Sequence, residues 1–122
     1  MKKSIEWVNL VNRYGNSFES PQMTQLKRAC QETIGEEAMT DREHPKCWLQ
    51  CGFSDESLCV LDLYESGKLL FTLYSDWDMH SVELETSRSN VKLETAIKAF
   101  AALSHGNVEA VKKVLRIDCS EF

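Results

Sequence analysis

The sequence has no long hydrophobic run and no export signal. No stretch approaches the ~18 consecutive apolar residues that are read as a membrane-spanning helix. Two lysines stand near the start, but polar residues interrupt the apolar positions that follow, and no small-residue cleavage site comes after them. These absences predict a cytoplasmic protein that does not bind a membrane.

The sequence also lacks the short motifs of the common enzyme classes. It contains no P-loop, GxGxxG, HExxH, GxSxG or paired CxxC pattern. The candidates that are left are His44 and the closely spaced Asp76, Asp78 and His80. Two carboxylates in a short loop occur often by chance, so we predict no catalytic residue, no metal and no cofactor. A small metal-dependent or His/Asp-using enzyme, built on this loop or on His44, is the alternative.

Disulfide bonds are not expected, although the chain has five cysteines. A protein that stays in the cytoplasm keeps its thiols reduced. Cys47 and Cys51 would stand ~13 Å apart on a strand, too far to bridge each other. We predict that most of the cysteines serve as small buried apolar residues. Cys119, near the C-terminus, is the thiol that we expect to be accessible.

Positive charge is scarce in the middle of the chain. Residues 31–89 hold thirteen acidic and four basic side chains, a formal charge of −9, whereas the rest holds six acidic and ten basic ones, a charge of +4. A nucleic-acid-binding surface would have the opposite sign, so we predict no direct nucleic-acid binding. The counterpart of an acidic surface is a basic protein partner. The simpler interpretation is that the acidic residues only keep the protein soluble.

The acidic middle of the chain is also rich in β-formers, and it predicts a four-stranded antiparallel meander. Short polar breaks of the kind that hairpins need, SDES, ESG and DWDM, separate the four runs. The expected strands are Cys47 to Phe53, Leu58 to Tyr64, Lys68 to Ser75, and a weaker run from His80 to Glu85.

Side-chain parity selects the register of this sheet, because a slip of one residue inverts every side chain. A two-residue turn before Lys68 would place Asp62 opposite Phe71 and bury a carboxylate. A three-residue loop with Gly67 in the left-handed conformation instead pairs Leu61 with Phe71 and makes one face wholly apolar. The other pairs expected on that face are Leu63 with Leu69, Cys59 with Leu73, Val82 with Leu73, and Leu84 with Phe71, beside Leu49, Cys51 and Phe53. On the opposite face we expect Gln50 beside Asp62, Trp48 beside Tyr64, and Thr72 beside Glu83.

Helical periodicity appears on both sides of the predicted sheet. Four helices are expected, from Ser4 to Gly15, from Pro21 to Gly35, from Asn90 to Gly106, and from Asn107 to about residue 115, followed by a frayed tail. In the first of them Trp7, Leu10, Val11 and Tyr14 would form the buried stripe. Residues 36–45 are the expected surface connection into the sheet. We therefore predict a single α+β domain over residues 1–122, with a four-stranded antiparallel meander and N-terminal and C-terminal helices packed mainly on one face.

The segment Glu43 to Met79 resembles small bacterial immunity proteins, which are encoded beside polymorphic or contact-dependent growth inhibition toxins. The shared features are an acidic residue before HP, an aromatic strand with a glycine near its end, a short acidic turn, the strand VLDLY, a glycine turn, and a DxD loop. Trp77 departs from the pattern, since a polar residue is expected there. The resemblance covers roughly a third of the chain. It implies a non-catalytic protein that binds the C-terminal domain of one toxin, commonly a nuclease, inside the producing cell.

The face opposite the predicted core combines carboxylates with aromatic residues, and we predict that it binds the toxin. It would cover the active site or substrate groove with carboxylates placed where phosphates would bind. A generic interaction module is a further alternative, as is binding through a helix or through residues 36–45. We expect a monomer. The predicted toxin-binding residues are Asp62, Thr72, Tyr74, Asp76, Trp77, Asp78 and Glu83.

Overall fold

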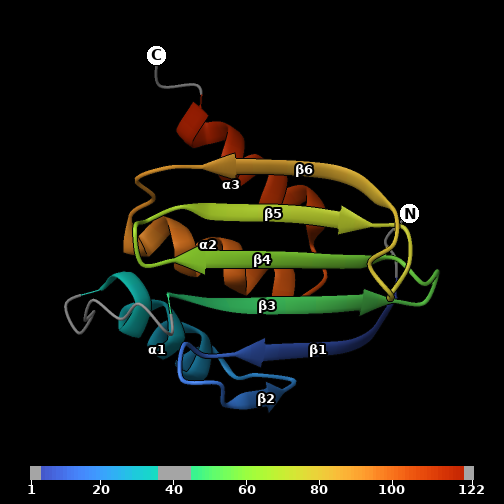
Figure 1. Cartoon of the computed structure of the whole chain (residues 1–122), viewed down its shortest axis with the longest axis horizontal. Coiled ribbons are helices and arrows are strands. Elements are labelled where there is room, and N and C mark those ends of the chain that lie inside the picture. Colours follow the sequence, from blue (N-terminus) through green and yellow to red (C-terminus); the bar gives the residue numbers. More distant parts are fainter. Residues whose placement is uncertain (1–3, 36–44, 120–122) are drawn as a thin grey trace.

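The computed structural model of the chain describes residues 4–35 and 45–119, with side chains as far as Leu115. This part contains six strands and three helices (Figure 1). They are β1 Ile5–Val11, β2 Ser17–Glu19, α1 Met23–Ile34, β3 Lys46–Phe53, β4 Leu58–Tyr64, β5 Leu69–Tyr74, β6 Val82–Arg88, α2 Leu93–Ser104 and α3 Val108–Cys119. All strands belong to one antiparallel sheet with the order β2-β1-β3-β4-β5-β6. In Figure 1 the sheet lies in front and the helices lie behind it.

The predicted α+β class and antiparallel sheet are confirmed, but the sheet has six strands rather than four. The first expected helix is wrong: Ile5–Val11 is a strand that pairs with β3 along most of its length. A run this short fits both the helical and the strand period. Trp7, Leu10 and Val11 fit one stripe of a helix, whereas Val8 and Leu10 fit one face of a strand, with Trp7 on the other. Pairing with β3 decides between them. Gly15, with φ +86°, turns the chain between β1 and β2 instead of ending a helix.

The register of the central hairpin is confirmed. Leu61 opposes Phe71 and Gly67 has φ +89°, as the three-residue loop requires. Between β3 and β4 the pairing is shifted by two residues from the prediction, so that Trp48 rather than Gln50 opposes Asp62. The backbone N–H of Phe53 donates to the carbonyl of Ser57, which makes the loop begin and end earlier than expected. Because the shift is even, every side chain keeps its predicted face.

The prediction for the last strand is wrong in its limits and in its packing. Val82 opposes Tyr74 and Leu84 opposes Leu73, so one step along β5 corresponds to two steps along β6, with Glu83 as the extra residue. Such a bulge inverts the alternation of side chains between the two faces of the sheet. It places Val82 on the same face as Tyr74, opposite the core. Val82 and Leu84 are 53% and 36% exposed instead of joining the core.

The hydrophobic core lies between the helices and the sheet face that carries Leu49, Leu61 and Phe71. The helices contribute residues such as Leu26 and Phe100 to the same cluster. Four cysteines of the described side chains are buried free thiols, as predicted: Cys30, Cys47, Cys51 and Cys59. The side chain of Cys119 lies outside the described ones.

The helix limits follow their capping residues. Gly35 ends α1 as expected, but the helix begins at Met23 after Gln22, which forms a capping box with Gln25, and not at Pro21. Lys92 rather than Asn90 is the N-cap of α2. Asn107 caps α3 as predicted, since its Oδ1 accepts from the N–H of Ala110 at 3.1 Å, but the helix continues to residue 119.

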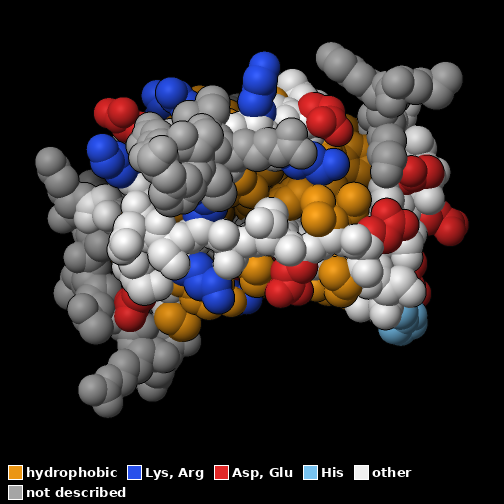
Figure 2. Space-filling view, turned by 90° about the horizontal axis from the view of Figure 1, so that it is seen from above, with side chains coloured by type: hydrophobic (Ala, Val, Ile, Leu, Met, Phe, Trp, Pro, Cys, Tyr) orange, Lys and Arg blue, Asp and Glu red, His pale blue; other side chains and the backbone are white. Residues whose placement is uncertain are grey.

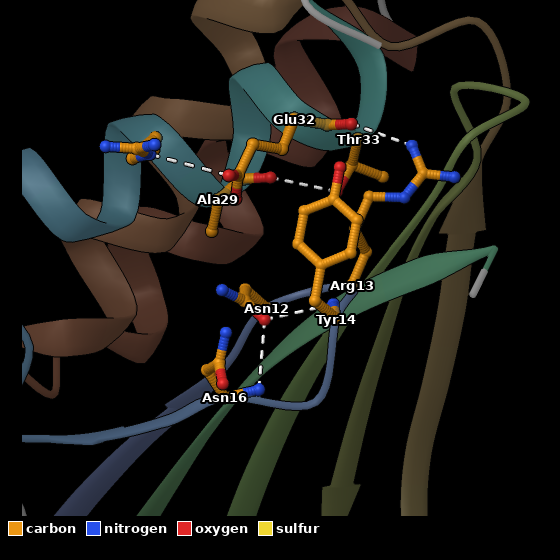
Figure 3. Close-up of polar contacts among 8 residues, drawn as sticks. Asn12, Arg13, Tyr14, Asn16, Ala29, Glu32 and Thr33 are labelled. Atoms are coloured by element: carbon orange, nitrogen blue, oxygen red, sulfur yellow. Dashed lines mark hydrogen bonds and ion pairs between the residues drawn. The ribbon is translucent and has the colours of Figure 1, made fainter. Parts of the chain in front are cut away.

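A buried arginine joins the turn between β1 and β2 to two distant segments. Arg13 is 2% exposed; its Nη2 is 3.0 Å from Oε2 of Glu65, and its Nη1 donates to the carbonyl of Glu32 at 2.7 Å (Figure 3). Glu65 lies in the β4–β5 loop and Glu32 in the last turn of α1. The guanidinium therefore fixes one corner of the sheet to the helix layer.

No helix in residues 4–35 and 45–119 is long and apolar enough to cross a membrane. Residues 36–44, which include most of the predicted connection and His44, lie outside the described residues.

Candidate functional site on the outer face of the sheet

The sheet has one face, here called the outer face, that looks away from the three helices (Figure 1). Strand pairing arranges its side chains in rows across the sheet. Trp7, Gly52, Leu58, Tyr74 and Val82 form the first row, next to the β5–β6 loop. The second row is Asn9, Gln50, Val60, Thr72 and Glu85, the third is Val11, Trp48, Asp62, Leu70 and Ser87, and Lys46 with Tyr64 begins a fourth.

Five of the six tryptophans and tyrosines gather on this outer face, whereas Phe53, Phe71 and Phe100 are in the core. They are Trp7, Trp48, Tyr64, Tyr74 and, from the β5–β6 loop, Trp77. Four of them are half-buried by their neighbours, and Trp77 is 41% exposed. Large aromatic side chains that are already held in place are typical anchors of protein interfaces.

Two of the tryptophans form a fixed pair at the first row. The ring of Trp7 lies over Gly52, where an added Cβ would come within 2.3 Å of the indole. Trp77 meets Trp7 in a T-shaped contact with 6.0 Å between ring centroids, and its Nε1 donates to the carbonyl of Ser57 at 3.0 Å. The β5–β6 loop therefore folds back over the end of the outer face. Sequence reasoning missed Trp7 because it placed this residue on a buried helical stripe.

The β5–β6 loop brings two carboxylates and an imidazole together. One possible ligand atom from each of Asp76, Asp78 and His80 lies within 4.8 Å of the others. Asp76 already binds its own loop: its Oδ1 accepts from the backbone N–H of His80 at 2.9 Å, and its Oδ2 is 3.2 Å from His80 Nδ1. The cluster could coordinate a divalent cation, but the hydrogen bonds of Asp76 also explain the shape of the loop without one.

The structure brings most, but not all, of the predicted binding residues together. Tyr74, Asp76, Trp77, Asp78 and Glu83 lie at the end of the sheet where β5 turns into β6. Asp62 stands two rows away from Tyr74, with its side chain 13% exposed and its Oδ1 3.0 Å from Lys46 Nζ. Thr72 does lie on the outer face, but it is 3% exposed and offers a partner almost no surface. Glu85, which the sequence analysis did not select, takes the expected place of Glu83 beside Thr72.

Charge divides the outer face into two ends. Glu56, Asp78 and Glu83 are exposed at the end near the β5–β6 loop. At the other end Lys46 lies 5.3 Å from the ring centroid of Trp48, and Lys68 lies 5.8 Å from that of Tyr64. Burial lowers the pKa of Lys46, but its hydrogen bond and charge interaction with Asp62 outweigh burial, and the pKa is raised. The aromatic pair Trp7–Trp77 thus lies at the acidic end, here called the acidic aromatic end.

A second candidate is the hollow of about 530 Å³ between the β1–β2 turn and α1. Tyr14 and Glu32 both line it, and Figure 3 shows the Tyr14 ring pointing toward Glu32. Asn12 builds its rim, because its Oδ1 accepts from the backbone N–H groups of Tyr14 and Asn16 at 3.0 Å. Arg28 Nε is 3.4 Å from the Glu32 carboxylate, so the charges of the hollow are paired with each other. This balance makes it a weaker candidate than the acidic aromatic end.

No family model matches the chain, and no match is found among curated proteins or among solved structures.

Proposed function

We propose that this protein is a cytoplasmic immunity protein that binds and neutralises the C-terminal domain of a cognate toxin, a basic nuclease. The observation that carries the proposal is the acidic aromatic end, where Trp77 is held against Trp7 next to Asp78 and Glu83. The resemblance of residues 43–79 to immunity proteins of contact-dependent inhibition systems points the same way.

The mode of inhibition follows from the charge of the two partners. A nuclease presents a basic groove to the phosphates of its substrate. Carboxylates on a rigid surface can occupy the same positions, and the exposed indole of Trp77 provides a contact for an apolar or guanidinium group of the partner. Opposite potentials speed the encounter, whereas the few desolvated contacts keep the complex together. The protein itself needs no catalytic group and no cofactor for this role, and one copy would bind one toxin domain.

The test is a neutralisation assay with the toxin domain of the secreted protein encoded directly upstream. That domain should degrade nucleic acid, and the purified immunity protein should stop the reaction and form a stable complex with it. A toxin domain from an unrelated system serves as the control and should stay active. A neighbouring nuclease that is neither bound nor inhibited would refute the proposal.

A metal-dependent enzyme is the second candidate, and the cluster of Asp76, Asp78 and His80 is the observation that favours it. Titration with Mn²⁺ distinguishes the two, because a paramagnetic ion broadens the NMR signals of nearby amides. Broadening confined to residues 76–80 at micromolar Mn²⁺ would favour the enzyme, and the same titration of Asp78→Asn should then show none.

A further inference from the structure

Strand β6 forms one end of the sheet. In the part of the chain that the structure describes, β5 pairs with one edge of β6 and no strand pairs with the other. The opposite end of the sheet is closed by the three-residue β2, whereas β6 has seven residues, six of them exposed. Backbone N–H and C=O groups that point away from β5 make an edge of this kind able to accept another strand.

The side chains around this edge are unusually apolar for an exposed segment. Seven large hydrophobic residues of the described part are exposed, and four of them lie within residues 77–84: Trp77, Met79, Val82 and Leu84. Figure 2 looks down on this edge and shows hydrophobic side chains gathered along its middle, with acidic side chains beside them. Exposed apolar residues bordered by charge mark an interaction surface.

The acidic residues of β6 decide which occupant fits. An antiparallel two-fold pairing with a second copy about Glu85 would place Glu85 opposite itself, and a pairing about Leu84 would place Glu83 opposite Glu85. Like charges directly opposite each other destabilise a sheet. Registers about Val82, Thr86 or Ser87 avoid this, but each of them pairs only part of β6 with its copy, at most residues 84–88. The same carboxylates attract a strand whose facing side chains are Lys or Arg.

We propose that β6 accepts an extended basic segment of a partner protein as a seventh strand. The backbone of the segment would pair with residues 84–87, in the regular part of β6 beyond the bulge. Its Lys or Arg side chains would face Glu85, and its apolar side chains, on the other face, would extend the row of Leu84. The inference rests on the free edge and its charges, and it holds whether or not the partner is a toxin.

Amide hydrogen exchange tests strand addition directly. The probe is a short synthetic peptide of alternating Lys and Val, added to the full-length protein at low salt. Within residues 84–87 the amides that pair with β5 should exchange slowly, and the alternate amides, which point away from β5, should exchange fast. The peptide should slow exchange of this second set by about tenfold or more. Unchanged exchange in β6 at saturating peptide overturns the proposal.

Two N-methylated peptides separate backbone pairing from simple charge attraction. One carries N-methyl groups on its Lys residues and the other on its Val residues, so that both keep the charge of the parent. A strand presents the N–H groups of alternate residues to each edge, so only one of the two should lose affinity, by about tenfold or more. Equal affinity of all three peptides would show that no strand is added.

Two further measurements complete the test: peptide binding by charge-reversal variants, and the dependence of amide exchange on protein concentration. The double variant Glu83→Lys, Glu85→Lys should bind the peptide at least about tenfold more weakly, whereas Glu94→Lys, Glu109→Lys, with the same change of net charge on α2 and α3, should bind as the wild type does. Protection of the free-edge amides that grows with protein concentration, without peptide, would identify a second copy as the occupant and overturn the proposal.

Discussion

Trp7 of β1 and Trp77 of the β5–β6 loop meet in a T-shaped contact, with their ring planes at 77° to each other. Two strands, β3 and β4, separate β1 from β5 in the sheet, so the loop reaches back across the first row of the outer face. The absence of a side chain at Gly52 gives the Trp7 ring its place. The geometry of the acidic aromatic end therefore depends on one glycine and two tryptophans.

Substitution of Gly52 by Ala is expected to disrupt this arrangement. The new Cβ would lie within 2.3 Å of the Trp7 indole, so the ring must move. Overpacking of this kind costs about 1–3 kcal/mol of unfolding free energy. Urea denaturation measures the loss, and the near-UV circular dichroism of the tryptophan pair should weaken with it.

A double-mutant cycle tests whether Trp7 is the cause. In a Trp7→Ala background, Gly52→Ala should cost much less than it does in the wild type, because the clashing ring is gone. Equal costs in the two backgrounds would show that the strain lies elsewhere.

Two apolar residues of the sheet should respond very differently to truncation. Phe71 is fully buried opposite Leu61, so Phe71→Ala should lower the unfolding free energy by about 3–5 kcal/mol. Val82 is 53% exposed next to the bulge, so Val82→Ala should change the unfolding free energy by less than about 0.5 kcal/mol. Denaturation curves of both variants check the register, and a large loss at Val82 would contradict the exposed position of this residue.

The central strands could be predicted because their signals are local. The three-residue loop before Lys68 needs a residue at positive φ, Gly67 supplies it, and one parity then makes a clean apolar face out of β4 and β5. The two-residue error between β3 and β4 came from the loop hydrogen bond of Phe53 to Ser57, which side-chain parity does not reveal.

The strands at the edges could not be predicted in the same way. Ile5–Val11 pairs with a strand about forty residues later in the chain, and nothing within the run itself favours strand over helix. The bulge at Glu83 lies next to the β5–β6 loop and decides which face receives Val82 and Glu85, and side-chain alternation within the run does not reveal it. The acidic residues of the β5–β6 loop were therefore proposed from the sequence, whereas Trp7 and Glu85 became candidates only in the structure.

Arg13 should be among the least replaceable polar residues of the fold. Its guanidinium is buried between Glu65 and the carbonyl of Glu32, so Arg13→Met removes an ion pair and a hydrogen bond at the same time. The Glu65 side chain is 27% exposed and can be hydrated once Arg13 is gone, so the loss of both contacts should cost about 2–4 kcal/mol. Chemical denaturation measures this, and Arg28→Met, an exposed arginine of α1, is the control that should cost little.

The buried thiols predict a loss of stability at high pH. Burial raises the pKa of Cys47 and of Cys51 from about 9 to about 12. Because the unfolded chain releases these protons first, their contribution to stability is full below pH 9 and falls as the pH rises toward 12. Urea midpoints measured across this range should decrease, and less so for Cys47→Ala, Cys51→Ala.

Thiol reactivity at neutral pH gives an independent check of the same burial. The four described cysteine side chains should react with Ellman's reagent only after unfolding, since the thiolate is the reactive form. A Cys119→Ser variant removes the remaining thiol from the count. Fast reaction of this folded variant would contradict the buried positions.

In the proposed toxin complex, two residues of the acidic aromatic end should affect different rate constants, one the dissociation rate and the other the association rate. Trp77 is 41% exposed and is the anchor in the proposed complex, so Trp77→Ala should raise the dissociation rate by about tenfold or more. Asp78 is an exposed charge, so Asp78→Lys should slow association and weaken its dependence on salt.

Variants of Asp62 and Asp76 are poorer tests of binding. Loss of Asp62 would break its ion pair with Lys46, and loss of Asp76 would open the β5–β6 loop, in addition to removing any contact with the toxin. Surface plasmon resonance with the toxin domain measures both rates, and Lys113→Glu on α3 is the control. If Trp77→Ala and Asp78→Lys, both folded, bind as the wild type does, the toxin contacts another surface.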